Sequence, residues 1–293
     1  MKMIKPIVNV SKVADAYDAV LCGFNGVLHD GVSFRAEALE ALLCLYKSGK
    51  KIVLLSNDCR RVEEIARLMH QNGFSPRLFS AMVTAGEILH HHLAAGRGVY
   101  ASLGKNCCCL DEDGGASLFE GLDFAVTADP AKADFLYVGR LPAGRAVDDY
   151  LDVLNHAASL GLPLLCAGND TSVVCGEDTV PAAGAVAEQY AVLGGRIITV
   201  GKPDPAVVDY ALAAFGPTER KRILMIGDSM ASDIRAASAA GISSCLVSKG
   251  VHVSFLGEGY IPDVTKTREL GNMIEAYPDY CLLYTSPSPR DRS

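Results

Sequence analysis

The chain has 293 residues, of which 49% are hydrophobic and 21% are charged, and its mean hydropathy is +0.21. This composition excludes an intrinsically disordered chain and suits one large or two moderate globular domains. The net charge is -7, and Lys and Arg form no dense stripe along the sequence. We therefore expect neither nucleic-acid binding nor binding to an anionic membrane.

The N-terminal residues 1–13 lack the long apolar stretch of a signal peptide, and no apolar run reaches membrane-spanning length. The chain has ten cysteines, several of them within apolar segments, where cysteine acts as a small buried hydrophobe. Since no secretory signal is evident, we expect reduced thiols and a cytoplasmic protein.

Both ends of the chain alternate between apolar runs and segments with helical periodicity. The expected strands are 19–24, 51–57, 197–202, 223–228 and 243–248, and the expected helices are 34–48, 61–72, 205–215 and 231–240. Near-continuous apolar strands separated by helices are typical of a parallel sheet with helices on both faces. The pattern therefore predicts an α/β fold with a doubly wound parallel sheet.

The middle of the chain forms a second unit in this interpretation. Its expected strands are 124–127, 135–139 and 162–167, and its expected helices are 86–95, 145–160 and 182–193. We predict a core made of residues 1–78 and 197–283, with a smaller α/β cap domain, residues 79–196, inserted between the two parts. The last ten residues, 284–293 (YTSPSPRDRS), differ in composition from the rest, and we interpret them as a non-native tail.

Polar or glycine positions lie at the C-terminal ends of four of the predicted strands, the edge where open α/β sheets bind ligands. In chain order they are Gly23 and Asn25 at the end of the first strand, Ser56 and Asn57 at the end of the second, Lys202 at the end of the third, and Asp228 and Asp233 at the end of the fourth or shortly after it. A lysine, a hydroxyl and two carboxylates at one sheet edge are the groups that a phosphoryl-transfer site uses.

The four fragments, in this order and with a cap-sized insert between the second and the third, resemble the motifs of the haloacid dehalogenase superfamily. More narrowly they resemble its subfamily IIA hydrolases, over residues 18–279. The resemblance implies a doubly wound core with an inserted α/β cap. It also implies a magnesium-dependent phosphatase that acts on a small phosphorylated metabolite.

The resemblance further implies a role for each residue. In the family pattern an Asp on the first strand attacks phosphorus, and a second Asp, two positions on, is the general acid/base. Here it implies Mg2+ ligands at Asp228 and Asp233, phosphate-binding residues at Ser56, Asn57 and Lys202, a catalytic charge on Lys202, and a cap residue facing the substrate at Asp170. As an alternative, Asp170 is simply a turn acid.

Two positions depart from the family pattern, because Gly23 stands at the nucleophile and Asn25 at the acid/base. Glycine has no side chain to attack or to bind metal, and asparagine cannot shuttle a proton near neutral pH. Loss of both groups is expected to lower the rate by about four decades or more. We therefore predict a catalytically impaired phosphatase-family protein, a pseudoenzyme, with weakened Mg2+ affinity.

Alternatives remain open for this site. The same fold is also suited to a non-catalytic sensor of a phosphometabolite or to a protein-interaction module, and the resemblance suggests a homodimer. Gly23 is alternatively a strand-end glycine selected for packing, or a sequence error. Two further signals have plainer interpretations: His90-His91-His92 as a solvated helix end, and Cys107-Cys108-Cys109 as a loop with reactive thiols.

Overall fold

A computed structural model describes residues 3–111, 114–257 and 263–282; the predicted non-native tail, 284–293, lies outside the described residues. A seven-stranded sheet forms the core, in the order β1-β14-β13-β12-β2-β3-β4, and all its neighbouring strands are parallel. The strands are β1 (Lys5–Ile7), β2 (Ala19–Cys22), β3 (Lys51–Ser56), β4 (Ala81–Thr84), β12 (Ile223–Gly227), β13 (Ser243–Val247) and β14 (Tyr280–Leu282).

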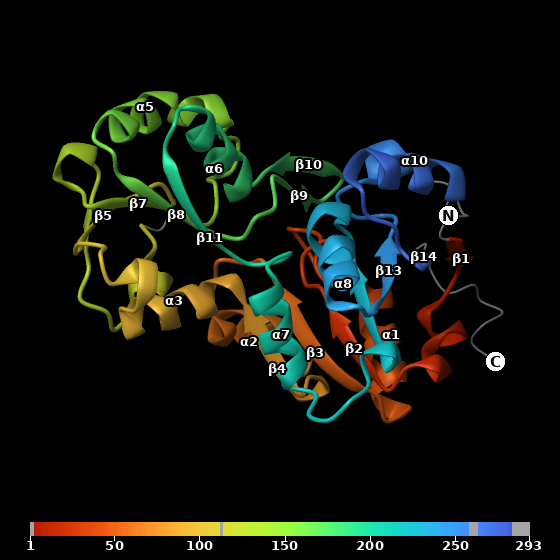
Figure 1. The fold of residues 1–293 in the computed structure, drawn as a ribbon. Helices are drawn as coiled ribbons and strands as arrows, with labels where there is room; N and C mark the ends of the chain where they lie inside the picture. Colours follow the sequence, from red (N-terminus) through yellow and green to blue (C-terminus); the bar gives the residue numbers. More distant parts are fainter. Residues whose placement is uncertain (1–2, 112–113, 258–262, 283–293) are drawn as a thin grey trace.

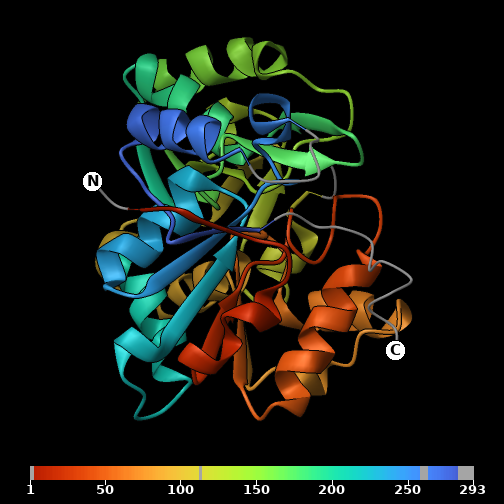
Figure 2. The same cartoon turned by 90° about the vertical axis from the view of Figure 1, so that its right-hand side faces the viewer.

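Helices cover both faces of this sheet because its central strands are apolar on both sides (Figure 2). Cys22 and Leu54 pack with α1 (Ala36–Lys47) and α2 (Val62–Gln71). Leu21 and Leu55 pack with α7 (Pro205–Ala213) and α8 (Arg235–Ala240) on the opposite face. The predicted α/β fold with a doubly wound parallel sheet is therefore confirmed.

A second, five-stranded parallel sheet lies beside the core, in the order β11-β8-β7-β5-β6 (Figure 1). Its strands are β5 (Asn106–Cys109), β6 (Ala125–Thr127), β7 (Phe135–Val138), β8 (Pro163–Ala167) and β11 (Arg196–Val200). The helices of this part are α3 (Ala85–Ala95), α4 (Ala116–Phe119), α5 (Leu151–Ser159) and α6 (Ala183–Val192). This is the predicted α/β unit between the two parts of the core.

The remaining elements join or extend these two layers. A π-helix (Met230–Ile234) leads directly into α8, and α9 (Val253–Leu256) and α10 (Val264–Ile274) pack near the C-terminal strand. An antiparallel hairpin, β9 (Ser172–Cys175) and β10 (Asp178–Pro181), forms a separate two-stranded sheet. No helix in the described ranges has the length and apolarity required to cross a bilayer.

Two strands belong to a different sheet from the one that the sequence predicted. β4, placed in the cap by the expected boundary at residue 79, pairs with β3 of the core. β11, expected as a core strand over 197–202, pairs with β8 of the smaller sheet. The chain therefore passes between the sheets after Thr84 and after Val200. Apolar runs identify strands, but they carry no signal for the sheet that each strand joins.

The predicted loop at Cys107-Cys108-Cys109 is wrong. These residues form β5, and Cys107 and Cys108 are buried between neighbouring strands. Burial raises the pKa of both thiols, which opposes thiolate formation and reactivity. These cysteines act as small apolar strand residues, as was expected for the cysteines within other apolar segments.

The hairpin rests on the loop between β2 and α1. The backbone N–H of Gly176 donates to the carbonyl of Asp30 at 2.8 Å. Gly31, with φ of +89°, lies so close that a Cβ there would be 2.5 Å from the carbonyl oxygen of Val174. The hairpin is therefore held against the core through a contact that requires glycine at position 31.

We expect Gly31→Ala to displace the hairpin and to destabilise the protein more than Gly49→Ala does. Both glycines have positive φ, but nothing lies within 4 Å of a Cβ at Gly49, so this variant isolates the steric part of the effect. The clash should cost about 1–3 kcal/mol more, or several degrees in Tm. Thermal unfolding and hydrogen exchange over residues 172–176 check this, and equal effects of the two variants would refute the contact.

Candidate functional site

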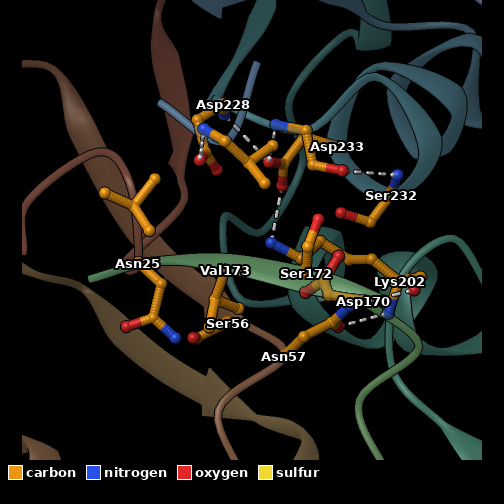
Figure 3. Close-up of a pocket in the computed structure, with 13 residues that line it drawn as sticks. Asn25, Ser56, Asn57, Asp170, Ser172, Val173, Lys202, Asp228, Ser232 and Asp233 are labelled. Carbon is orange, nitrogen blue, oxygen red and sulfur yellow. Dashed lines mark hydrogen bonds and ion pairs between the residues drawn. The ribbon is translucent and has the colours of Figure 1, made fainter. Parts of the chain in front are cut away.

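A small pocket, partly open to solvent, lies where β3 and β12 end and the hairpin approaches them (Figure 3). The core and the cap both line it. Its lining includes seven of the eight residues singled out in the sequence: Asn25, Ser56, Asn57, Asp170, Lys202, Asp228 and Asp233. The structure thus brings together residues from four fragments and from the cap, and Gly23 lies at the end of β2 beside them.

A buried ion pair joins Lys202 and Asp233. The Nζ of Lys202 lies 2.6 Å from Oδ1 of Asp233, and the two side chains are only 5% and 3% exposed. The same ammonium donates to the carbonyl of Leu55 at 3.0 Å. Although burial opposes the charged form of Lys202, the neighbouring Asp233 raises its pKa, so the lysine stays charged at neutral pH.

The second oxygen of Asp233 fixes the turn after β12. Oδ2 accepts the backbone N–H of Asp228 at 3.0 Å and that of Ser229 at 3.1 Å. Asp233 therefore uses both oxygens within the protein, one on a cation and one on backbone donors. These bonds let Asp233 shape the site, and its role at a metal ion stays a prediction.

Asp228 is held at the opposite side of the pocket floor. Its Oδ2 accepts the N–H of Val251 at 2.8 Å. The chain packs so tightly here that a Cβ at Gly26 would lie 1.8 Å from that oxygen, and one at Gly250 would lie 2.1 Å from Cβ of Asp228. Burial, followed by the charge of Asp233, raises the pKa of Asp228. A proton or a cation is therefore stabilised at this carboxylate.

Magnesium is the metal that the family resemblance implies, and Asp228 is the residue that suits it. Asp233 has its oxygens in hydrogen bonds, and Gly23 has no side-chain oxygen. Within the described ranges, no three His, Cys, Asp or Glu side chains gather in a way that suits a metal ion. The donors therefore fit a magnesium ion held through one carboxylate, a set that Mg2+ accepts when a phosphate ligand adds oxygens.

A Cβ at Gly23 would make tight contacts with buried neighbours. The N–H of Gly23 donates to the carbonyl of Ile226 at 2.8 Å, as in a continuing strand. A Cβ there would lie 3.1 Å from Cγ2 of Val27 and 3.4 Å from the carbonyl oxygen of Ile226. A small shift of the Val27 methyl group would accommodate it. Packing alone therefore does not require glycine at this position.

Neither of the nearby acids replaces the missing carboxylate. Asp30 accepts the backbone N–H groups of Val32 and Ser33 in its own turn. Arg60 donates two hydrogen bonds to Asp58, from Nε to Oδ1 at 2.9 Å and from Nη2 to Oδ2 at 2.7 Å. Burial alone would raise the pKa of Asp58, but the Arg60 bonds lower it overall. Neither acid is among the residues that line the pocket.

Asn57 supports Lys202 in the structure. Its Nδ2 donates to the carbonyl of Lys202 at 3.0 Å, and its Oδ1 accepts the N–H of Lys202 at 2.6 Å. Asn169, from the cap, donates to the same carbonyl at 3.3 Å. Asn57 therefore positions Lys202, since both ends of its amide face the lysine backbone, and its role as a phosphate ligand stays a prediction. Asn169 is a contact that the sequence analysis missed.

Ser56 and Asp170 both line the pocket. The hydroxyl oxygen of Ser56 accepts the N–H of Asp58 at 3.1 Å, which leaves its proton to donate elsewhere. Burial raises the pKa of Asp170, while the charge of Lys202 and side-chain hydrogen bonds oppose that shift. Asp170 thus lies at the core site, and its contact with a substrate stays a prediction.

Two family models match the two parts of the chain. Residues 20–125 match the model described as haloacid dehalogenase-like hydrolase, and residues 199–262 match the one described as HAD-hydrolase-like. A glycerol-3-phosphate phosphatase of Gallus gallus is 26% identical over 256 residues, which is 80% of each chain. The ribonucleotide monophosphatase NagD of Escherichia coli K12 is 27% identical over 79% of this chain and 88% of its own.

Solved structures have the same architecture. A haloacid dehalogenase-like hydrolase from Brucella suis 1330 superposes with a TM-score of 0.78 and 26% identity, over 94% of this chain and 98% of that one. The structure of NagD from Escherichia coli K-12 gives a TM-score of 0.60 at 22% identity, over 91% and 96% of the two chains. The latter supports the fold alone.

His252 was missed in the sequence, and it holds the turn that carries Asp228. Its Nε2 accepts the backbone N–H of Met230 at 3.0 Å, at the start of the π-helix. This contact requires a neutral imidazole. Burial lowers the pKa of His252 to about 4, from an ordinary value of 6.5. The histidine directly after Val251 gave no sequence signal, because its partner, Met230, is distant along the chain.

We expect His252 to make the protein less stable as pH falls from about 6.5 to about 4. In that window the unfolded chain binds a proton at His252 and the folded chain does not, so protonation favours unfolding. The loss should approach about 3 kcal/mol. Urea unfolding across this range should show a flatter profile for His252→Gln. His70→Gln, at an exposed histidine, is the control, and a slope unchanged by His252→Gln would contradict the assignment.

Proposed function

Because the chain belongs to the haloacid dehalogenase superfamily, and within it to the subfamily IIA hydrolases, we propose that its pocket binds the phosphate group of a small metabolite and hydrolyses it slowly or not at all. One observation carries this proposal. The ion pair between Lys202 and Asp233 is formed, while Gly23 leaves the attacking position without a side-chain oxygen.

The donors around the pocket support phosphate binding. Lys202 uses its ammonium on Leu55 and Asp233, which leaves one N–H for a further acceptor. The hydroxyl proton of Ser56 is similarly available. The matched relatives with known names are phosphatases, among them a glycerol-3-phosphate phosphatase and a ribonucleotide monophosphatase. A phosphate group at the ends of β3 and β12 would accept from both Lys202 and Ser56.

The same residues explain why turnover should be slow. An aspartyl-phosphate requires a carboxylate oxygen at the end of β2, and Gly23 has none. Asn25, at the pocket wall, can hydrogen-bond but cannot take up and release a proton near neutral pH. Water could still attack the phosphorus of a bound ester directly, without an aspartyl-phosphate intermediate. Without a general base, this route gives little acceleration.

Magnesium belongs to the proposal as a weakly held cofactor. Members of this superfamily generally use Mg2+, which neutralises charge on the transferring phosphoryl group when it is bound. In this chain Asp228 would hold the ion, and the phosphate ligand would supply further oxygens. We also propose a cytoplasmic location, a homodimer, and no nucleic-acid or membrane partner.

A non-catalytic form of this function is a sensor that reports the metabolite through the cap. The cap and the site touch directly, since Asp170 hydrogen-bonds with Ser232 and Asn57 of the core. A ligand held between these parts would stabilise their contact. This form and the slow enzyme share one binding site, and the presence or absence of turnover separates them.

We expect Gly23→Asp to gain phosphatase activity, on the order of a hundredfold or more over the wild type. A Cβ here requires only that the Val27 methyl group shift by a few tenths of an ångström, and the added carboxylate would supply the attacking oxygen at the end of β2. Release of p-nitrophenol from p-nitrophenyl phosphate with Mg2+ is the measurement. Gly23→Asn is the matched control, since it has the same size without the nucleophile.

Clear turnover by the wild type, abolished by Asp228→Ala, would overturn the impaired-enzyme proposal. Activity in Gly23→Asn equal to that in Gly23→Asp would show that the gain does not come from a nucleophile. Phosphate-dependent thermal stabilisation of the wild type, lost in Lys202→Met, would favour the sensor.

A further inference from the structure

We propose that a second pocket, between the cap and the core, binds the carboxylate group of a small metabolite on Arg140 and Tyr137. The loop that follows β3 contributes Cys59 and Arg60 to its wall, and the cap contributes the other lining residues, among them Asp111. None of these five residues lines the first pocket. The inference is therefore independent of the proposed phosphate binding.

The second pocket lies at the carboxyl edge of the cap sheet, where the strand order changes direction. β5 pairs with β6 on one side and with β7 on the other, and β8 and β11 continue on the side of β7. Asp111 comes shortly after β5 and Arg140 shortly after β7, so both lie at this change of direction. Open α/β sheets bind ligands in the crevice at such a point. The topology of the cap therefore favours a ligand here.

Tyr137 supplies this pocket with a buried hydroxyl group. Tyr137 lies on β7, is 1% exposed and packs its ring edge-on against Phe119, with 5.7 Å between the ring centroids. In the described part of the chain, its hydroxyl group makes no hydrogen bond. A Cβ at Gly139 would be 2.2 Å from the hydroxyl oxygen, 2.6 Å from Cβ of Cys59 and 2.9 Å from Oδ2 of Asp111, so the hydroxyl group lies among residues of the pocket wall. A buried hydroxyl group of this kind favours an acceptor within the pocket.

Arg140 supplies the positive charge. Its backbone N–H donates to Oδ1 of Asp111 at 3.1 Å, which holds the residue at the pocket. Among the residues that the structure describes, none forms a hydrogen bond or an ion pair with its guanidinium group. By contrast, Arg60 donates from Nε and Nη2 to Asp58, so its charge is already compensated. Arg140 is therefore the cation with which a bound anion would pair.

The charges at the pocket favour a carboxylate over a phosphate dianion. Oδ1 of Asp111 accepts the N–H of Gly139 at 2.6 Å as well as that of Arg140, and the negative charge of Asp111 lies beside any ligand. A dianion would meet more repulsion from it than a monoanion. A carboxylate also has two oxygens in one plane, one for the guanidinium group of Arg140 and one for the hydroxyl group of Tyr137.

A ligand in this pocket would contact both parts of the chain. A Cβ at Gly86 of α3 would lie 1.8 Å from the carbonyl oxygen of Cys59, and one at Gly139 would lie 2.6 Å from its Cβ, so the cap packs closely on this core residue at two points. A carboxylate on Arg140 of the cap would also lie beside Arg60 of the core. Binding should therefore stabilise the folded chain.

The test is thermal unfolding of the full chain in increasing sodium acetate, with sodium chloride of equal ionic strength as the reference. For an affinity on the order of 1 mM, we expect acetate at about ten times Kd to raise Tm by a few degrees. Tyr137→Phe keeps the ring that packs on Phe119 and removes only the hydroxyl group. We expect it to weaken acetate binding about tenfold, and we expect Arg140→Gln to remove the Tm shift.

Two matched variants make the same changes elsewhere. Tyr210→Phe removes a hydroxyl group from α7, where Tyr210 is 61% exposed, and Arg97→Gln neutralises an exposed arginine of the cap. Both should keep the acetate effect of the wild type. Inorganic phosphate is the comparison anion, and a phosphate-dependent shift that Arg140→Gln retains would support two separate sites.

Three results would overturn the inference. The first is a wild type that acetate does not stabilise, and the second is an equal acetate effect in Tyr137→Phe and Tyr210→Phe or in Arg140→Gln and Arg97→Gln. The third is a stronger effect of phosphate than of acetate that depends on Arg140, since the site would then select another anion. The proposed function of the first pocket would stand in each case, because it rests on Lys202 and Ser56.

Discussion

The ion pair between Lys202 and Asp233 is the constraint on which the site depends. Two charges with almost no exposure are tolerable only when their remaining hydrogen-bonding groups are satisfied. The carbonyl of Leu55 and the N–H groups of Asp228 and Ser229 meet that need. The pair therefore fixes the end of β3 and the turn after β12 relative to each other. Removing either partner would leave a buried charge, at a cost of about 3–5 kcal/mol.

This arrangement explains how the site keeps its shape without a side chain at position 23. No contact of the ion pair passes through that residue, whose own bond is a backbone one to Ile226. The support of Lys202 comes from Asn57 in the core and Asn169 in the cap. The lysine is thus positioned where the two parts of the chain meet, and its placement is linked to the position of the cap.

Much of the core could be predicted from the sequence because its strands are short apolar runs between amphipathic helices. The predictions for 51–57 and 223–228 agree with β3 (Lys51–Ser56) and β12 (Ile223–Gly227). The sequence could not show which strands pair with one another. The strand β11 was predicted correctly but was placed in the wrong sheet. The hairpin β9–β10 was missed, because the residue it packs against, Gly31, lies far away along the chain.

The site shows the same limit. The order of the fragments was enough to single out residues such as Lys202 and Asp228, since parallel strands end at one edge of a sheet. The hydrogen-bond partners of each side chain could not be predicted from the sequence. Asn57 is an example, because its amide is committed to a backbone 145 residues away.

The balance of charge also bears on why a phosphate would bind where catalysis is weak. Asp170, Asp228 and Asp233 surround a single buried lysine, so the pocket already carries more negative than positive groups. Burial and the neighbouring negative charges raise the pKa values of Asp170 and Asp228. A further carboxylate at position 23 would add to it and would repel a phosphate dianion unless a metal ion offset the charge. In the proposed function, glycine at position 23 omits that repulsion together with the nucleophile. It would thus favour binding of an anion and lessen the dependence of this binding on Mg2+.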